Sequence, residues 1–263
     1  MLALIAGGGG LPRRVAEAQE TFPLICGYEG VVLEGIRADM TFRLETLGTL
    51  LNMLQARGVS QVSFCGTVAR PSFDPAALDA DTLYLVPLFQ KALAAGDDGA
   101  LRTLVEIFEH AGFEVVAAQD IAPGLMAEPG VLSRRQPDEQ MSADAKRAAD
   151  VCHTLASLDV GQCCVVGQTQ VMGIETIGGT DHLLATLPAR ARGSKAILFK
   201  GPKPQQTQLV DMPTIGPSTL KAAHKAGLAG VIIVAGQVIV LEPDRCIALA
   251  NELGLVLWSR SAA

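Results

Sequence analysis

Charged side chains and a rigid backbone come together in residues 194–217 of the chain. An apolar run over residues 196–199 has the length and the Gly and Pro neighbours of a buried strand. Prolines and glycines then exclude regular structure, and the predicted loop carries two cations, two amides and a carboxylate: Lys200, Lys203, Gln205, Gln206 and Asp211. α/β proteins commonly hold reacting groups on such loops at strand ends, although a plain surface loop with solvated lysines is the alternative.

A second set of polar residues lies upstream. Residues 162–166 and 171–174 are predicted to form a hairpin, which places Glu175 at a strand end. A carboxylate has little reason to be there unless it points into a site. Asp181 follows shortly after, and it could be no more than the N-cap of a helix over residues 182–187.

The N-terminus has the pattern of a phosphate-binding loop. A strand over residues 2–6 leads into four glycines and then into a helix that extends to Glu20, with Pro12 in its first turn. This order aims backbone N–H groups and a positive helix end at an anion. The fingerprint G-x-G-x-x-G is only partly met, so a nucleotide or nucleotide-sugar loop is favoured over a strict NAD site. A tight strand-to-helix turn is the structural alternative.

Other predicted strand ends carry weaker candidates. Gly66 and Thr67 follow a strand over residues 61–65 and are well placed for the same ligand, or they form a plain turn. Glu29, after a strand over residues 23–27, lies near the position of a ribose-binding acid. Asp98 could cap a helix over residues 100–111.

A dense run of prolines and glycines over residues 118–137 is interpreted as the connection between two domains, residues 1–130 and 131–263. It contains Arg134 and Arg135, whose planar guanidinium groups suit phosphate, although a surface ion pair explains either one equally well. Strands and helices alternate on both sides. The expected architecture is therefore α/β, with an N-terminal Rossmann-like parallel-sheet domain, a C-terminal α/β domain and the ligand in the interdomain cleft.

Composition excludes several classes of protein. The net charge is −6 and charged residues make up 18% of the chain, so there is no basic footprint for nucleic acid. The longest apolar stretch, residues 227–236, is about half of what a bilayer requires. The N-terminus is a poor signal peptide because its arginines follow the apolar run, which predicts a cytoplasmic protein. The six cysteines and four histidines lack metal-ligand spacing.

Several motifs resemble one enzyme family. They are Glu175-x-x-x-Gly-Thr-Asp181, Lys200-Gly-Pro-Lys-Pro followed by the segment at residues 210–217, and the connection at residues 132–139. Together they are similar to the UDP-2,3-diacylglucosamine pyrophosphatases of the LpxI type, which act in the lipid A pathway of Gram-negative bacteria. The resemblance runs nearly from end to end. A fourth glycine and Leu11, where the family more often has a polar residue, depart from the pattern.

The resemblance implies Mg²⁺-dependent hydrolysis of UDP-2,3-diacylglucosamine to UMP and 2,3-diacylglucosamine 1-phosphate. Lys200 and Lys203 would bind the diphosphate, and Asp211, with Glu175 or Asp181, would hold Mg²⁺ or orient water. The expected substrate contacts are Gly8, Gly9, Gly10, Leu11, Gly66, Thr67, Asp98, Arg134, Arg135, Thr180, Gln206 and Thr214. An apolar groove for the acyl chains, transient contact with the inner membrane surface and a homodimer are further expectations.

Two other classes of protein stay open. One is an NAD-dependent oxidoreductase, suggested by Gly7, Gly9 and Glu29, which the missing third glycine disfavours. The other is a noncatalytic nucleotide-sugar or lipid-binding protein. Carboxylates near a diphosphate are repulsive unless a metal intervenes, so the acidic residues favour catalysis.

Overall fold

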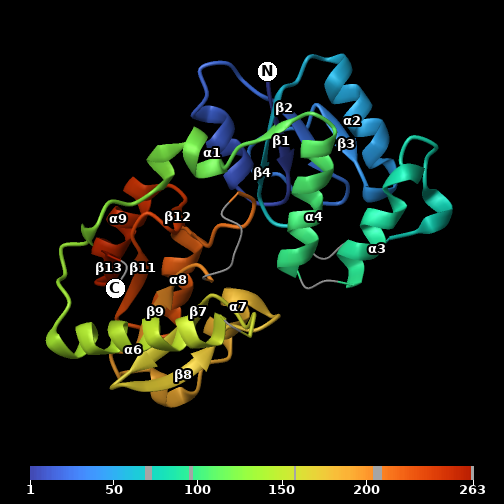
Figure 1. Ribbon diagram of the computed structural model, residues 1–263. Helices are drawn as coiled ribbons and strands as arrows, with labels where there is room; N and C mark the ends of the chain where they lie inside the picture. The colour runs from blue at the N-terminus through green and yellow to red at the C-terminus, as the bar shows by residue number, and fades with distance from the viewer. Residues whose placement is uncertain (69–72, 95–96, 157, 204–208, 262–263) are drawn as a thin grey trace. The chain divides into compact units, whose positions relative to one another are not determined.

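The computed structural model describes residues 1–68, 73–94, 97–156, 158–203 and 209–261, although the side chains of residues 93, 94, 97 and 98 are excluded (Figure 1). The chain divides into two compact units. The N-terminal unit comprises residues 1–123 and 207–211, and the C-terminal unit comprises residues 124–206 and 212–263. The changeover at residues 123 and 124 falls within the predicted Pro- and Gly-rich connection.

The N-terminal unit contains a five-stranded, wholly parallel sheet in the order β3-β2-β1-β4-β5. Its strands are β1 (Leu2–Ala6), β2 (Leu24–Tyr28), β3 (Met40–Phe42), β4 (Gln61–Cys65) and β5 (Glu114–Val115). The chain runs outward from β1 to β3 and then returns to β4 beside β1, so the strand order reverses between these two strands. This is the doubly wound order, and it confirms the Rossmann-like prediction.

The helices of this unit are α1 (Leu11–Glu17), α2 (Leu47–Ala56), α3 (Val86–Ala94), α4 (Asp97–His110) and α5 (Ala118–Ile121). Short 3-10 turns occupy Leu44–Thr46, Pro75–Ala77 and Leu83–Leu85, and another, Pro123–Leu125, lies at the changeover to the C-terminal unit. The helix α3 begins only at Val86, after the two 3-10 turns at Pro75–Ala77 and Leu83–Leu85. Pro87 lies in the first turn of α3, where its missing N–H costs little.

The core of the N-terminal unit forms on the leucine face of α2. Leu47, Leu50, Leu51 and Leu54 are all buried there, and each contributes about 1.5–3 kcal/mol by leaving water. The ring of Phe108 in α4 packs edge-on against Phe64 of β4, with centroids 5.1 Å apart. The same hydrophobic cluster thus includes residues from α2, α4 and the sheet.

The C-terminal unit contains a six-stranded mixed sheet in the order β6-β13-β11-β9-β7-β8. Its strands are β6 (Gly130–Val131), β7 (Cys163–Gly167), β8 (Gln170–Ile174), β9 (Ile197–Lys200), β11 (Gly230–Val234) and β13 (Val256–Arg260). The strands β9, β11 and β13 are parallel, whereas β6, β7 and β8 pair antiparallel. A second, two-stranded parallel sheet joins β10 (Thr214–Ile215) to β12 (Ile239–Val240).

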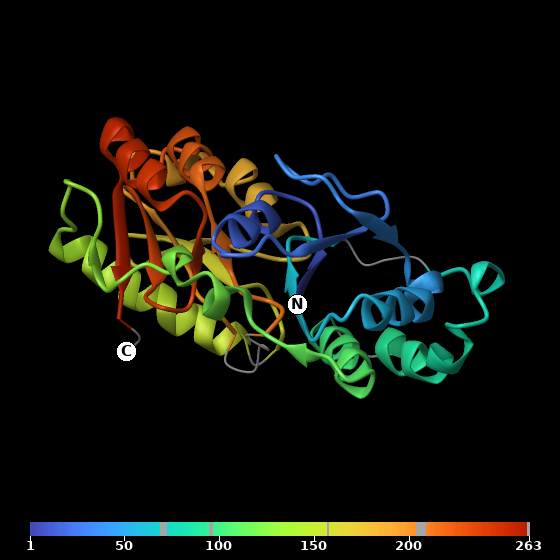
Figure 2. The same ribbon diagram turned by 90° about the horizontal axis from the view of Figure 1, so that it is seen from above.

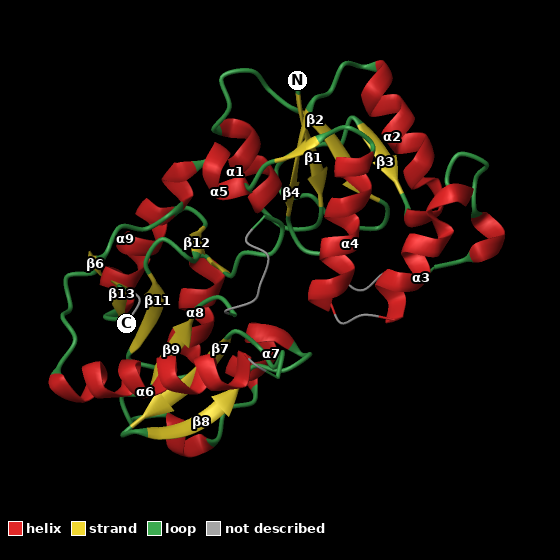
Figure 3. Cartoon of the chain, in the orientation of Figure 1, coloured by secondary structure: helices red, strands yellow, loops and turns green. Residues whose placement is uncertain are grey.

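Helices cover both faces of the larger sheet (Figure 2). They are α6 (Glu139–Ala156), α7 (Gly179–Ala185), α8 (Pro217–Lys225) and α9 (Pro243–Leu253), with a 3-10 turn at Ala189–Ala191. The helix α6 packs with Cys164 and Val166 of β7, and α7, α8 and α9 pack with Cys163 and Val165. Successive residues of a strand point to opposite faces, so the nearly all-apolar β7 matches a strand buried on both sides. Figure 3 shows these helices and strands by type.

A buried carboxylate fixes the hairpin between β7 and β8. The turn residues Gln168 and Thr169 have φ angles of 52° and 60°, which non-glycine residues seldom adopt. Their N–H groups donate to the carboxylate of Asp144 in α6, at 3.1 and 2.6 Å. Asp144 is 1% exposed and also accepts from Gln140. These bonds compensate the strained turn and tie it to α6.

Candidate functional site

The glycine loop between β1 and α1 is bonded to its own domain. The N–H of Gly7 donates to the carbonyl of Cys65 at 2.8 Å, and Gly8 and Thr67 exchange two backbone hydrogen bonds of 2.7 and 2.9 Å. The N–H of Gly9 donates to the carbonyl of Val32 at 3.0 Å. The structure therefore brings Gly8, Gly66 and Thr67 together, but the N–H groups of Gly8 and Gly9 already have partners. Substrate contact by this loop stays a prediction.

Close approach of two backbones explains two of the glycines. A Cβ added to Gly7 would lie 2.8 Å from backbone atoms of Gly66 and Thr67. A Cβ added to Gly66 would lie 2.5 Å from the carbonyl oxygen of Gly7, and its φ of +95° is also unfavourable for other residues. These glycines have a structural reason to be present, whatever the loop binds.

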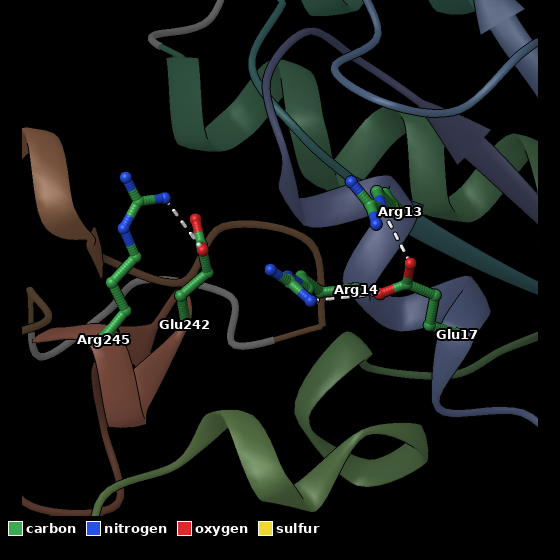
Figure 4. Close-up of polar contacts among 5 residues, drawn as sticks. All are labelled: Arg13, Arg14, Glu17, Glu242 and Arg245. Carbon is green, nitrogen blue, oxygen red and sulfur yellow. Dashed lines mark hydrogen bonds and ion pairs between the residues drawn. The ribbon is translucent and has the colours of Figure 1, made fainter.

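Two arginines near this loop were not selected from the sequence. Arg13 and Arg14 lie in the first turns of α1, and both pair with Glu17, at 2.6 and 3.1 Å (Figure 4). The hydrogen bond from Arg13 lowers the pKa of Glu17. Basic residues just inside a helix that follows a glycine loop are a signal that could have identified them. Figure 4 also shows the pair of Arg245 and Glu242 in the C-terminal unit, at 3.1 Å.

The C-terminal unit contains a chain of polar contacts that we call the Glu175–Thr180–Lys200 network. The ammonium of Lys200, at the end of β9, donates to the hydroxyl of Thr180 in α7 at 2.9 Å. That hydroxyl donates to Glu175 Oε1 at 2.6 Å. The other carboxylate oxygen of Glu175, Oε2, accepts from the N–H of Gln162 at 2.8 Å. Three predicted site residues are thus joined across 25 positions of sequence.

Burial makes this network energetically important. Glu175 and Lys200 are each 6% exposed. A buried charge is costly unless it is paired and hydrogen-bonded, and the Thr180 hydroxyl links the two opposite charges. Burial and the charge of Glu175 raise the pKa of the neighbouring Cys163 thiol, so this cysteine stays neutral at physiological pH.

Lys203 lies in the loop after β9. Its ammonium pairs with Asp159 at 2.5 Å, and the two side chains are 21% and 50% exposed. The ammonium is therefore held on the less exposed side of this pair, and the Asp159 carboxylate is the half-exposed partner.

The predicted carboxylates are distributed over both units. Asp181 is exposed in the first turn of α7, and the N-cap of that helix is Gly178, so the alternative of Asp181 as cap was wrong. Asp211 is half-buried and belongs to the N-terminal unit, whereas Glu175 and Asp181 belong to the C-terminal unit. Within the described parts of the chain, no group of three or more His, Cys, Asp or Glu side chains is arranged to hold a metal ion.

Glu175 is poorly suited to Mg²⁺. Both of its carboxylate oxygens already accept hydrogen bonds from protein donors, at 2.6 and 2.8 Å. A metal ion would have to displace one of these donors and would then lie next to the Lys200 ammonium. The carboxylates of Asp181 and Asp211 stay the predicted ligands.

The remaining predicted residues have mixed surroundings. The guanidinium of Arg135 donates to the carbonyl of Gly254 at the end of α9 (2.7 Å), and the backbone N–H of Arg134 donates to Asn251 (2.7 Å). The hydroxyl of Thr214 donates to the carbonyl of Met212 at 3.2 Å. Gln205, Gln206 and the side chain of Asp98 lie outside the described residues. Glu29 is an exposed partner of Arg43, at 3.8 Å.

No helix in the described residues is both long and apolar enough to cross a bilayer.

Comparisons with known proteins cover both units. The family model of the LpxI N-terminal domain matches residues 1–125, and that of the LpxI C-terminal domain matches residues 128–258. The chain is also similar to the UDP-2,3-diacylglucosamine pyrophosphatase LpxI of Caulobacter vibrioides. The two are 35% identical over 275 aligned residues, which cover 97% of this chain and 95% of the relative.

Proposed function

This chain belongs to the LpxI family, and we propose that it hydrolyses the pyrophosphate bond of UDP-2,3-diacylglucosamine to give UMP and 2,3-diacylglucosamine 1-phosphate. The observation that carries the proposal is similarity to a pyrophosphatase over both domains, with 97% of the chain covered. The activity is that of a hydrolase in lipid A biosynthesis.

The buried ammonium of Lys200 supports a role in binding the diphosphate. Hydrolysis adds water to one phosphorus and breaks its bond to the bridging oxygen, which leaves with the other phosphate. Charge on the nonbridging oxygens must be neutralised as this happens. An ammonium has three N–H donors, and one of those of Lys200 is used by Thr180. Among the described residues the other two have no acceptor and can serve phosphate oxygens, and Lys203 adds a second cation.

Asp211 is proposed to orient the attacking water or to contribute to a Mg²⁺ site with Asp181. Both belong to the motifs that resemble the family, and neither is fully buried. Bound Mg²⁺ would supply charge neutralisation on the phosphate oxygens. In this proposal Lys200 and Lys203 bind the diphosphate, and Asp211 acts on the attacking water or the metal.

Two exposed apolar side chains support contact with the lipid part of the substrate or with the membrane surface. Leu158 is 70% exposed and Ile177 is 99% exposed. Their loops adjoin, because a Cβ added to Gly161 would lie 2.2 Å from the carbonyl oxygen of Glu175. We place the acyl chains, or the lipid surface from which they come, at these loops.

The direct test is release of UMP from UDP-2,3-diacylglucosamine by the purified protein, with Mg²⁺ and with EDTA. Metal-dependent release of UMP is expected. Mass spectrometry of copurified lipid provides the second measurement. A bound lipid without turnover under either condition would contradict the hydrolase and favour a carrier, whereas binding of NAD would favour an oxidoreductase.

A further inference from the structure

The direction of each hydrogen bond in the Glu175–Thr180–Lys200 network follows from chemistry. An ammonium can only donate, and an ionised carboxylate can only accept. The Thr180 hydroxyl has one hydrogen, which goes to Glu175 at 2.6 Å, so its lone pair accepts from Lys200 at 2.9 Å. Among the described residues, Thr180 is therefore a one-way link between a buried cation and a buried anion.

The backbone of Gln162 makes hydrogen bonds at two points of this network. Its N–H donates to Glu175 at 2.8 Å, and its carbonyl accepts from the N–H of Gly201 at 3.0 Å. Gly201 follows Lys200 directly and is buried, and a Cβ there would lie 2.7 Å from Val234. The Gln162 backbone thus fixes the residue that follows Lys200 and, through Glu175 and Thr180, the Lys200 ammonium. The Lys200 side chain has little freedom as a result.

We propose that Glu175 and Thr180 are positioning residues for Lys200, and that Glu175 acts through Thr180 and not as a metal ligand. They hold the ammonium so that the N–H donors for which the described residues provide no acceptor face the diphosphate. This inference rests on the proposed pyrophosphatase function. Pre-arranged donors matter in catalysis because they need no reorganisation as charge develops in the transition state.

Asp144 provides an internal control for a purely structural role. It is a second buried carboxylate of the same unit, 1% exposed, and its described hydrogen bonds come from the amides of Gln140, Gln168 and Thr169. Its bonds hold a turn, whereas those of Glu175 lead to a cation. Loss of either carboxylate is expected to lower stability. Only loss of Glu175 should alter the binding and hydrolysis of the diphosphate.

The experiment compares Thr180→Val, Thr180→Ser, Glu175→Gln and Asp144→Asn in the full-length protein. For each variant we would measure Tm, kcat and KM for UMP release, the Mg²⁺ concentration for half-maximal rate, and the Kd values of UDP and UMP. Thr180→Val and Glu175→Gln are expected to lower kcat/KM by about tenfold to a hundredfold, less than removal of a direct transition-state donor. Both substitutions should also weaken the binding of UDP more than the binding of UMP. Thr180→Ser keeps the hydroxyl and should retain most of the wild-type kcat/KM. Asp144→Asn should lower Tm and leave kcat/KM unchanged.

Several outcomes would overturn the inference. One is a Thr180→Val variant with a lowered Tm but kcat/KM within about threefold of the wild type, a change below 1 kcal/mol. Another is a rise in the Mg²⁺ requirement of Glu175→Gln that Thr180→Val does not share, because that pattern marks a metal ligand. If Thr180→Val fails to fold, the kcat/KM values of Glu175→Gln and Thr180→Ser test the inference in its place. If the wild type releases no UMP, the proposed function fails, and the Kd of UDP still tests the positioning role separately.

Discussion

The glycine loop after β1 and the Glu175–Thr180–Lys200 network are both candidates for binding a phosphate. They differ in the hydrogen-bond donors that remain for a ligand after folding. In the loop, the N–H groups of Gly7, Gly8 and Gly9 already donate to backbone carbonyls. In the network, Lys200 donates one N–H to Thr180, and its other two have no acceptor in the part of the chain that the structure describes. A backbone donor satisfied within the fold is not available to a ligand. A loop is therefore a good phosphate site only if it keeps backbone donors that the fold does not use.

The largest effect is expected from Lys200→Met, which tests the network side of the comparison. Loss of the cation should lower kcat/KM by about a thousandfold, the upper range for removal of one preorganised donor. It also leaves Glu175 buried without its cation, so the free energy of unfolding should fall by about 3–5 kcal/mol. Steady-state kinetics and chemical denaturation measure the two effects. Unchanged kcat/KM in the folded variant would remove Lys200 from the site.

Asp211→Asn is expected to lower kcat more than about a hundredfold, the scale of a principal acid–base or electrostatic group. Tm is measured as well, to separate a loss of stability from a loss of catalysis. The check is single-turnover release of UMP, with Asp159→Asn as a matched control that removes an exposed loop carboxylate of the Lys203 pair. Activity retained by Asp211→Asn would refute its assigned role.

Gly66→Ala tests whether the loop glycines are structural. The added Cβ would lie 2.5 Å from the carbonyl oxygen of Gly7, at a φ of +95°. Because the contact is with backbone, the unfolding free energy is expected to fall by about 1–3 kcal/mol from strain of this kind. Urea denaturation measures it. A fully stable variant would show that the two backbones can separate without cost.

Gly8→Ala should give the smallest effect on stability, and it is the matched control for Gly66→Ala. Its Cβ would lie 3.4 Å from the carbonyl oxygens of Thr67 and Val32, and its φ lies outside the left-handed region. Stability is expected to stay within about 0.5 kcal/mol of the wild type, as for substitutions without strain or burial. Any rise in KM for the substrate would then mark ligand contact at the loop, and an unchanged KM would argue against it.

The amino-acid sequence determined the elements that depend on local pattern. The strands β1 and β4 have the predicted bounds, because short apolar runs end at Gly. The strands β3, β6 and β10 were missed. They have two or three residues each, and such short strands exist only through pairing with distant strands. The sequence also identified Glu175 as a carboxylate with an unusual position.

Only the tertiary structure decided what these residues contact. Nothing local shows that Glu175 meets Thr180 and Lys200, because the contact depends on the register of β7 between β8 and β9. Nor does the sequence show that Gly7 and Gly66 face each other, or that Asp144 holds a turn 24 residues away. Local pattern is written in neighbouring residues, whereas hydrogen-bond partners are set by packing, which brings distant parts of the chain within a few ångströms.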